Sequence, residues 1–303
     1  MTWEGSSRKF LFRFGRRQLL AALAAGLAAR SAGADEAGEL TEDLRNLRLL
    51  DLSEGGRRFV LVVPKYLEPG QKLPLAVLLH GLGETGNERL GAYAWVEKYG
   101  LGNAWQRLKR APIERTSKRG EWSDARLAEV NTELSARPFR GLALACPYMP
   151  LPGGPADLDA YAKWIEHSLI ARVRKETEVR EGAAQTYLCG VSLGGYVSLE
   201  VLVRTPHVFG AWAGVQTATG PSVAMGYAEK IANAWKDAPS PHPMLLLTST
   251  QDHFRSSSEA LAAAFKAKGL AATYRVVPGP HDQPWLKEAG TLEALLWLDR
   301  IGR

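Results

Sequence analysis

The most informative segment of the chain reads Thr186-Tyr187-Leu188-Cys189-Gly190-Val191-Ser192-Leu193-Gly194-Gly195. Its first four residues predict a short strand, and apolar residues recur with helical spacing from Leu193 onward. A serine in a GxSxG sequence between a strand and a helix lies on a sharp turn, which exposes its hydroxyl above the sheet and requires small neighbours. Gly190 and Gly194 meet that requirement, so Ser192 is a candidate nucleophile.

The same alternation of strand and helix continues along the chain from residue 44 onward. Short apolar or β-branched runs predict strands at 47–52, 58–64, 75–79, 142–146, 186–189, 210–215, 244–248 and 273–277. Helical spacing predicts helices at 157–175, 193–204, 257–268 and 291–301. The turn residues at 53–56 predict a hairpin between the first two strands. Several later strands are apolar on both faces, which predicts an α/β fold with a mostly parallel central sheet and helices on both faces.

A second glycine-rich segment follows the strand predicted at 75–79 and reads His80-Gly81-Leu82-Gly83-Glu84-Thr85-Gly86. Together with the serine turn, it resembles the α/β-hydrolase serine esterases. The loop is similar to that of carboxylesterases and acyl-protein thioesterases. The opening strand and its proline-rich lead-in are similar to those of secreted feruloyl esterases and polyhydroxybutyrate-depolymerase-like enzymes. The resemblance spans about residues 44–303 and implies the α/β-hydrolase fold.

Acyl transfer through a serine needs two backbone N–H groups aimed at the negatively charged oxygen of the tetrahedral intermediate. The N–H of Leu193, directly after the candidate nucleophile, is one such donor. The resemblance implies that the N–H of Leu82 is the other donor. It also implies that His80 has a structural role and is not the base.

A serine hydroxyl needs a base to take its proton, and the base needs an acid to hold its tautomer. The resemblance implies the chain order serine, acid, histidine, which points to His281 in the loop after the last predicted strand. Asp252 follows the strand at 244–248, at the edge of an open α/β sheet where catalytic loops gather, and is the expected acid. Asp282 is the rival, although a residue adjacent to the base points elsewhere on an extended chain.

Three residues near Asp252 depart from the family pattern or add to it. Ser249 and Thr250 stand where these enzymes often have a glycine, so the geometry of the turn before Asp252 stays open. His253 is expected to face solvent or to line a pocket.

The sequence lacks the usual motifs of metal-dependent hydrolases and of the nucleotide-binding P-loop. The chain contains no HExxH, no CxxC, no carboxylate cluster at ligand spacing and no GK[ST]. We therefore expect neither a metal nor a nucleotide cofactor.

The composition, 46% hydrophobic and 23% charged residues over 303 residues, is that of a globular protein. The formal net charge is +6, yet residues 1–34 hold six basic residues and one acidic residue, so the remainder is nearly neutral. Without a basic face to neutralise phosphates, we expect no nucleic-acid partner.

Residues 1–34 have the layout of an export signal. A basic region containing Arg16 and Arg17 precedes an apolar core at 19–29 and the small residues at 32–34. The arginine pair followed by Gln18-Leu19-Leu20 resembles the twin-arginine signal for folded proteins. The alternative is an amphipathic membrane anchor, which the weakly hydrophobic alanine-rich core disfavours. We expect a periplasmic or extracellular protein, without stable membrane insertion after signal removal, and residues 35–303 as one domain.

Cys146 and Cys189 are the only cysteines, and both lie in predicted central strands. In the predicted fold a third strand separates them by about 10 Å, which is beyond disulfide reach. We expect two buried free thiols.

The segment 83–139 is long for one connection and rich in aromatic residues. We expect it to include a helix and to pass over the sheet edge. With Tyr148 and Trp285 it is a candidate substrate pocket, the alternative being that its aromatic residues only pack on the sheet. Its basic residues between Lys109 and Arg119 either attract an acidic substrate or form a solvated loop.

The resemblance and these residues imply an exported serine hydrolase that cleaves small-molecule or oligosaccharide esters through an acyl-enzyme, without a cofactor. A serine peptidase of the prolyl-oligopeptidase-like branch and an acyltransferase would use the same residues and stay open as alternatives. A non-enzymatic binding module is disfavoured because Ser192, Asp252 and His281 are all present.

Overall fold

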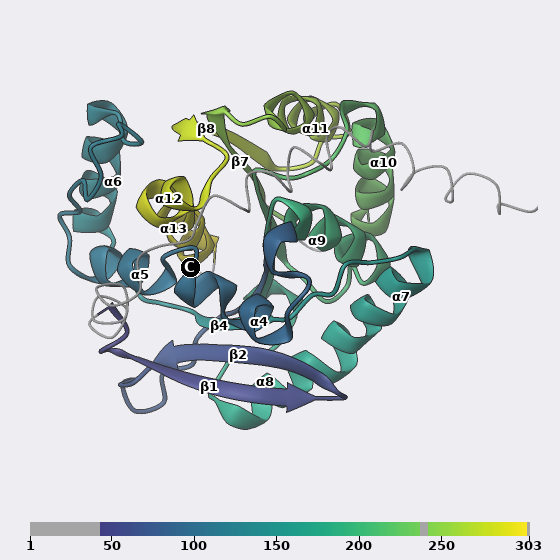
Figure 1. Cartoon of the computed structure of the whole chain (residues 1–303), viewed down its shortest axis with the longest axis horizontal. Coiled ribbons are helices and arrows are strands. Elements are labelled where there is room, and N and C mark those ends of the chain that lie inside the picture. The colour runs from purple at the N-terminus through teal and green to yellow at the C-terminus, as the bar shows by residue number, and fades with distance from the viewer. Residues whose placement is uncertain (1–42, 237–241, 302–303) are drawn as a thin grey trace, which may run out of the picture.

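The computed structural model describes residues 43–236 and 242–301. The predicted export signal at 1–34 lies outside these residues. The central feature is an eight-stranded sheet in the order β1-β2-β4-β3-β5-β6-β7-β8 (Figure 1). The strands are β1 (Leu47–Glu54), β2 (Arg57–Pro64), β3 (Leu75–Leu79), β4 (Ala143–Pro147), β5 (Thr186–Val191), β6 (Ala211–Val215), β7 (Met244–Gln251) and β8 (Ala272–Pro280).

The direction of the strands confirms the predicted mostly parallel sheet. β2 pairs antiparallel with both β1 and β4, whereas all neighbours from β4 to β8 run parallel. The carboxyl ends of six parallel strands therefore meet at one edge, where the loops that follow them can converge.

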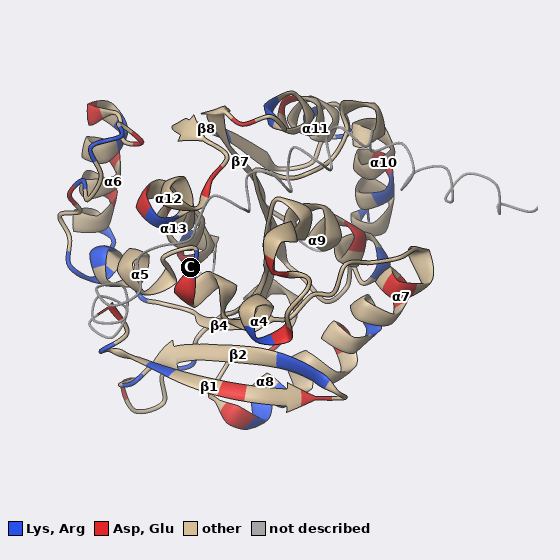
Figure 2. Cartoon of the chain, viewed as in Figure 1, with Lys and Arg blue, Asp and Glu red and all other residues tan. Residues whose placement is uncertain are grey.

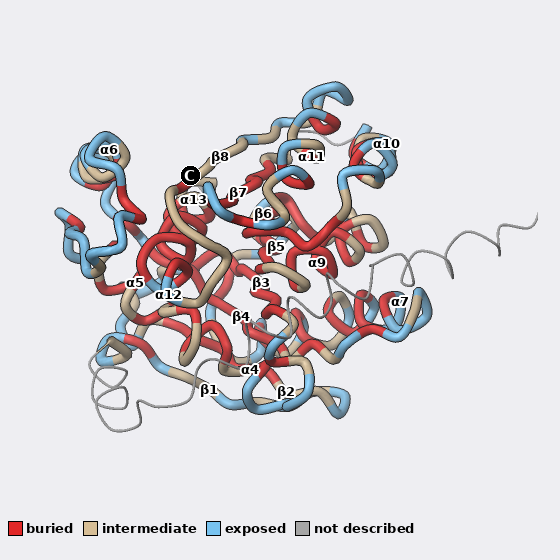
Figure 3. Tube along the Cα trace, turned by 45° about the horizontal axis from the view of Figure 1, so that its top comes forward, coloured by how far each residue is buried: buried red, intermediate tan, exposed pale blue. Residues whose placement is uncertain are grey.

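Helices cover both faces of the sheet because successive strand residues point to opposite sides. Along β3, Ala76 and Leu78 pack in one core cluster, and Leu75, Val77 and Leu79 pack in the other. The first cluster includes residues from α4 (Glu88–Glu97), α5 (Leu101–Lys109), α6 (Asp124–Ala136) and α13 (Thr291–Ile301). The second includes residues from α7 (Pro155–Trp164), α8 (Ile170–Glu176), α9 (Leu193–Arg204), α10 (Ala224–Trp235) and α11 (Arg255–Ala267). In Figure 3 the buried residues run through the central strands and the inner sides of these helices.

Short turns complete the described elements. They are the 3-10 turns η1 (Leu82–Glu84), η3 (Ala183–Gln185) and η4 (Pro221–Val223), the π turns η2 (Ile165–Leu169) and η5 (Leu286–Gly290), and the single helical turn α12 (Gln283–Trp285).

The predicted strands are all present, and the helices outside the 83–139 segment differ from prediction in two main places. The helix expected at 157–175 begins at Pro155, after Gly154, and contains the π turn η2 between α7 and α8. The sequence analysis missed α10, which begins without a capping side chain and has Gly226 in its first turn. Both features weaken the local signal of a helix start.

The segment 83–139 forms η1 and three helices, where the sequence predicted one. Trp95, Trp105 and Trp122 are buried in the first core cluster, as expected if the aromatic residues pack this segment onto the sheet. Several of its basic residues have partners within the protein: Arg115 pairs with Asp124, and Lys109 donates to the carbonyl of Arg140 at 3.0 Å.

The cysteines lie as predicted. Cys146 is on β4 and Cys189 on β5, β3 lies between them, and both are fully buried free thiols.

Positions of charged residues of both signs are interspersed along the outer elements of the ribbon in Figure 2. Within the described part of the chain, no helix combines the length and apolarity needed to cross a bilayer.

Candidate active site

Ser192 forms the turn between β5 and α9 in a strained backbone conformation, with φ 54° and ψ −116°. This region is unfavourable for a residue with a side chain. A Cβ atom at Gly190 would lie 2.1 Å from the carbonyl oxygen of Gly194, and one at Gly194 would lie 2.4 Å from that of His80. The turn therefore tolerates no side chain at either glycine position, as the motif predicted.

A chain of hydrogen bonds joins Ser192, His281 and Asp252, which come from the loops after β5, β8 and β7. The Oγ of Ser192 lies 3.1 Å from Nε2 of His281, and Nδ1 of His281 lies 2.7 Å from Oδ1 of Asp252. With the ring proton on Nδ1, His281 donates to Asp252 and accepts from Ser192. This arrangement can take a proton from the serine hydroxyl.

Asp252 is held in a buried, well-bonded position. Its Oδ2 accepts the hydroxyl of Thr248 at 2.6 Å, and its Oδ1 also accepts the backbone N–H of Phe254 at 2.9 Å. Burial by itself raises the pKa of Asp252, but these bonds and the one from His281 outweigh it and hold the pKa below its usual range. The carboxylate thus stays charged beside the histidine.

Asp282, the rival acid, does not reach His281. Its carboxylate accepts the backbone N–H of Trp285 at 2.9 Å, which caps α12, and binds Arg119 of the 83–139 segment at 2.7 Å. The structure therefore brings Asp252, and not Asp282, to the histidine.

The amides of Leu82 and Leu193 both stand at the first position of a helical turn, η1 and α9. N–H groups at that position have no partner within the helix and are available to an anion. The neighbouring amide of Gly81 is occupied, because it donates to the hydroxyl of Tyr99 at 2.9 Å.

His80 is fully buried and bonded to backbone on both sides of its ring. Nδ1 lies 2.8 Å from the carbonyl oxygen of Gly81, and Nε2 accepts the N–H of Met149 at 2.9 Å. Burial lowers its pKa to about 4, against the opposing effect of the bond to Gly81. A neutral histidine with both nitrogens engaged has no means of acting on Ser192.

The two expected pocket residues have different surroundings. Tyr148 is partly exposed, stacks on His80 and donates its hydroxyl to the carbonyl of Thr85 at 2.7 Å. Trp285 is fully buried, and its indole N–H donates to the carbonyl of Pro278 at 2.9 Å. Trp285 therefore has its place in the core beneath the histidine loop, and not in the wall of an accessible pocket as expected from the sequence.

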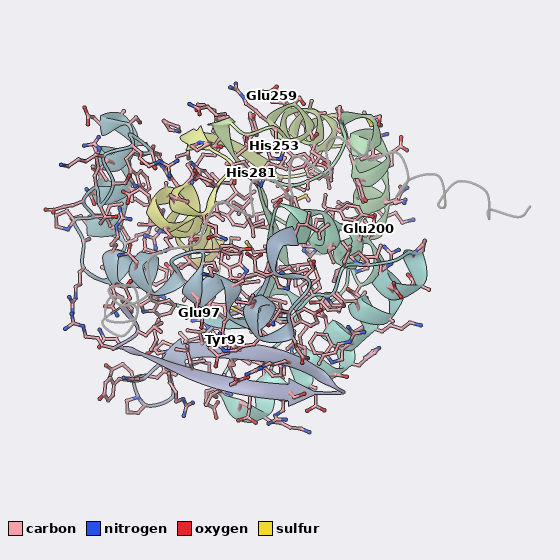
Figure 4. The ribbon with its side chains drawn as sticks, viewed as in Figure 1. Tyr93, Glu97, Glu200, His253, Glu259 and His281 are labelled. Carbon is pink, nitrogen blue, oxygen red and sulfur yellow. The ribbon has the colours of Figure 1, made fainter. Side chains whose placement is uncertain are left out.

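His253 and His281 lie side by side near the ends of β7 and β8, with ring centroids 4.4 Å apart (Figure 4). Burial lowers the pKa of His253, and the neighbouring His281 adds to this effect. Within residues 43–236 and 242–301, these histidines and Asp252 are the one cluster of possible metal ligands, with ligand atoms within 4.8 Å of one another. Because Asp252 and His281 are already bonded to each other and to Thr248 and Ser192, the cluster suits proton transfer better than metal binding.

Three supporting residues escaped the sequence analysis. Thr248 donates to Asp252, Tyr99 accepts from the loop at 80–86, and Gln216 at the end of β6 has a positive φ of 47°. Only Thr248 carried a local signal, as a hydroxyl at the end of an apolar strand four residues before the acid.

Comparison with known proteins gave structural matches alone. Neither the protein-family models nor the curated protein sequences match this chain. A ferulic acid esterase structure is 15% identical over 84% of this chain and 98% of its own, with a TM-score of 0.61. A serine-to-alanine mutant of the feruloyl esterase module from Clostridium thermocellum, complexed with sinapinate, is 14% identical over 90% and 92%, with a TM-score of 0.60. The S-formylglutathione hydrolase of Staphylococcus aureus is 12% identical over 84% and 96%, with a TM-score of 0.55. The chain therefore has the α/β-hydrolase fold.

Proposed function

We propose that this protein is a serine esterase that cleaves carboxylic esters through an acyl-enzyme. The observation that carries the proposal is the chain of hydrogen bonds from Ser192 Oγ through His281 to the buried carboxylate of Asp252, at 3.1 and 2.7 Å. A nucleophile bonded to a base that is itself oriented by an acid is the arrangement that activates a serine hydroxyl.

In the proposed reaction, Ser192 Oγ attacks the ester carbonyl while its proton passes to Nε2 of His281. The tetrahedral intermediate collapses as His281 returns that proton to the leaving alcohol, which leaves an ester between Ser192 and the acyl group. A water molecule then repeats the sequence, with His281 as base, and releases the acid. The negative charge of Asp252 stabilises the imidazolium at each stage.

The backbone N–H groups of Leu82 and Leu193 are the proposed donors to the oxyanion. Both are unpartnered within their helical turns, and the N-terminus of α9 adds a favourable dipole at the nucleophile. No step of this mechanism needs a metal or another cofactor.

The proposed substrate is a small-molecule or oligosaccharide ester, and the structural matches favour one with an aromatic acyl group. Two of the matched structures are titled ferulic acid or feruloyl esterases, and one of these holds sinapinate. In this chain, Tyr148 is the expected pocket residue that is partly exposed near the oxyanion loop, and an aromatic ring there suits stacking on an aryl group.

The test is the initial rate of the form that begins at Asp35, on methyl ferulate and on p-nitrophenyl esters of increasing acyl length. Ser192→Ala should fold normally and lose at least about 10³-fold in kcat. Near-parental ester turnover by that variant would defeat the proposal. Parallel assays with p-nitroanilides and with added alcohol acceptors report the two alternatives: amide cleavage would favour the peptidase, and ester exchange that exceeds hydrolysis would favour the acyltransferase.

We also propose that residues 1–34 export the protein by the twin-arginine route and that residues 35–303 form the mature domain. The support is the sequence order alone, with Arg16-Arg17 ahead of an apolar core and small residues. Replacement of both arginines by lysine should leave the protein in the cytoplasm, as measured by fractionation and immunoblotting. Export of this variant at the parental level would exclude the twin-arginine route.

A further inference from the structure

Gln216 is the first residue after β6, and its backbone is strained. Within residues 43–236 and 242–301, the positive-φ residues other than glycine are Ser192 and Gln216, with φ of 54° and 47°. A side chain at such a φ costs free energy, and such outliers persist where the surroundings impose them, most often at functional sites. The strained conformation of Gln216 therefore needs an explanation beyond sheet geometry.

The backbone around Gln216 supports the nucleophile. The N–H of Ser192 donates to the carbonyl of Val215 at 2.9 Å, and the carbonyl of Ser192 accepts the N–H of Ala218 at 3.0 Å. The N–H of Gln216 itself donates to the carbonyl of Leu247 on β7 at 2.7 Å. The turn at 215–218 thus holds Ser192 by both of its backbone polar groups.

The side chain of Gln216 extends to the loop that carries the base. Its Nε2 donates to the carbonyl of Pro280 at 3.0 Å and to Oγ of Ser249 at 2.8 Å. Ser249 Oγ donates in turn to the same Pro280 carbonyl at 3.0 Å. Pro280 directly precedes His281, so this carbonyl with two donors is the last backbone acceptor before the base.

Ser249 and Thr250 stand where the esterases that this chain resembles often have a glycine, and both bind the end of β8. Next to Ser249, the hydroxyl of Thr250 accepts the N–H of Gly279 at 3.1 Å. The pairing of β7 with β8 shifts register between Ser249 and Gln251, and the side chains of Ser249 and Thr250 contact the end of β8 at residues 279–280. A glycine at position 249 would lose the bond to the Pro280 carbonyl, and a glycine at position 250 would lose the bond from the Gly279 N–H.

We propose that Gln216 is a positioning residue that sets the separation between Ser192 Oγ and His281 Nε2. One residue joins the two sides: its backbone belongs to the turn behind the nucleophile, and its amide holds the residue before the base. The inference rests on the proposed roles of Ser192 and His281. A misplacement of about 1 Å, caused by a change away from the reacting atoms, can lower the rate about 100-fold.

Packing alone does not account for this side chain. Gln216 is 0% exposed, yet its Oε1 accepts no hydrogen bond from the residues that the structure describes. An apolar residue of the same length would fill the space without an unsatisfied acceptor. What the apolar residue would lack is the donor to Pro280 and Ser249.

The experiment compares Gln216→Met with the matched control Gln106→Met. Gln106 is also a buried glutamine, and its Nε2 donates to the carbonyl of Asp43 at 3.0 Å, but it lies on α5, away from the site. Both variants lose a buried side-chain donor and should melt at a lower temperature than the parent. Gln216→Met should lower kcat between about 10-fold and 100-fold with KM within about twofold. Gln106→Met should leave kcat unchanged.

Ser249→Ala is the second variant, because it removes one of the two donors to Pro280 and leaves Gln216 in place. We expect a smaller fall in kcat than for Gln216→Met, and a slower reaction of Ser192 with a phosphonate inhibitor in both variants. Equal kcat for the parent, Gln216→Met and Ser249→Ala would overturn the inference. If the proposed function were wrong, Ser192→Ala would instead hydrolyse esters at the rate of the parent.

If Gln216→Met does not fold, Gln216→Glu provides the same test with a closer shape. A carboxylate cannot donate to the Pro280 carbonyl, so kcat should fall in this variant at neutral pH although the side chain is isosteric. Parental kcat for Gln216→Glu at neutral pH would overturn the inference as well.

Discussion

The hydroxyl of Tyr99 donates a hydrogen bond to the carboxylate of Glu84 at 2.6 Å, and the same oxygen accepts the amide of Gly81 at 2.9 Å. Tyr99 lies between α4 and α5 in the 83–139 segment, and Gly81 and Glu84 belong to the loop with the proposed oxyanion donor Leu82. All three bonded groups are buried. The long segment therefore contacts the loop of the proposed oxyanion donor through the phenol of Tyr99, whereas its buried tryptophans pack in the first core cluster.

Tyr99→Phe removes the acceptor of the Gly81 amide and the donor to Glu84. We expect the loss of about 1–3 kcal/mol in the free energy of unfolding, because a buried N–H group is left without a partner. We also expect kcat to fall about tenfold or more, because the adjacent Leu82 amide is less well oriented. Urea unfolding and steady-state kinetics measure the two effects.

Tyr93→Phe is the matched control for that variant. Tyr93 belongs to the same segment, on α4, but its hydroxyl donates to the carboxylate of Asp51 at 3.1 Å near the surface. Its kcat should equal that of the parent. A tenfold fall in kcat for Tyr93→Phe too would mean that the segment acts through general stability and not through the Gly81 contact.

Burial raises the pKa of Glu84 above its ordinary range, although the bond from Tyr99 opposes this shift. A carboxyl whose folded pKa exceeds its unfolded value binds more protons in the folded state, so its contribution to stability is lost as the pH rises through the folded pKa. Glu84→Gln cannot ionise and keeps an oxygen for Tyr99. Its free energy of unfolding, relative to the parent, should therefore increase from pH 4 toward pH 8. A difference that stays constant over that range would contradict the raised pKa.

Asp252→Asn should keep the geometry of the site and lower kcat by about 10⁴-fold, because an amide favours the wrong tautomer of the histidine. Asp282→Asn is the control, since Asp282 caps α12 and pairs with Arg119. Asparagine keeps the cap and loses only the partly exposed pair with Arg119, so this variant should cost at most about 1 kcal/mol of stability and leave kcat within a few-fold of the parent. Steady-state assays of both variants on one ester make the comparison, and the reverse ranking would identify Asp282 as the acid.

Glu293 is fully buried in α13 and accepts hydrogen bonds from Arg126 of α6 and Arg275 of β8, at 2.7 and 2.6 Å. Glu293→Ala should cost about 3–5 kcal/mol in the free energy of unfolding, because it leaves both arginines without this partner. Arg126 also pairs with Glu129, whose side chain is 65% exposed. Glu129→Ala should therefore cost at most about 1 kcal/mol in the free energy of unfolding. If urea unfolding gave similar losses of free energy for the two variants, the buried ion pairs of Glu293 would contribute no more to stability than the exposed pair of Glu129.

The local part of the fold followed from sequence patterns. Apolar runs and their alternation predicted every strand, and α9 and α13 have the predicted bounds. These predictions hold because strand and helix periodicity depend on neighbouring residues only. Where local signals were weak the prediction failed: α10 has no cap, and the helices of 83–139 depend on contacts with the sheet and the C-terminal region.

The candidate site divides in the same way. The nucleophile turn could be recognised because Gly190 and Gly194, which the turn requires on steric grounds, lie within two residues of Ser192 in the sequence. His281 and Asp252 were assigned from their order and from the strands before them. The choice against Asp282 became clear only from its contacts, since Arg119 lies 163 residues away along the chain.

The sequence by itself determined the succession of strands along the chain and the strained serine turn, since both depend on short-range sterics and periodicity. Its resemblance to the serine esterases supplied the candidate residues that could act with Ser192. The tertiary structure alone decided which side chains meet. It placed Trp285 in the core, joined Tyr99 to Gly81, and brought the amide of Gln216 to Pro280, 64 residues further along the chain. Such contacts depend on how the strands are ordered in the sheet, and no local pattern in the chain records them.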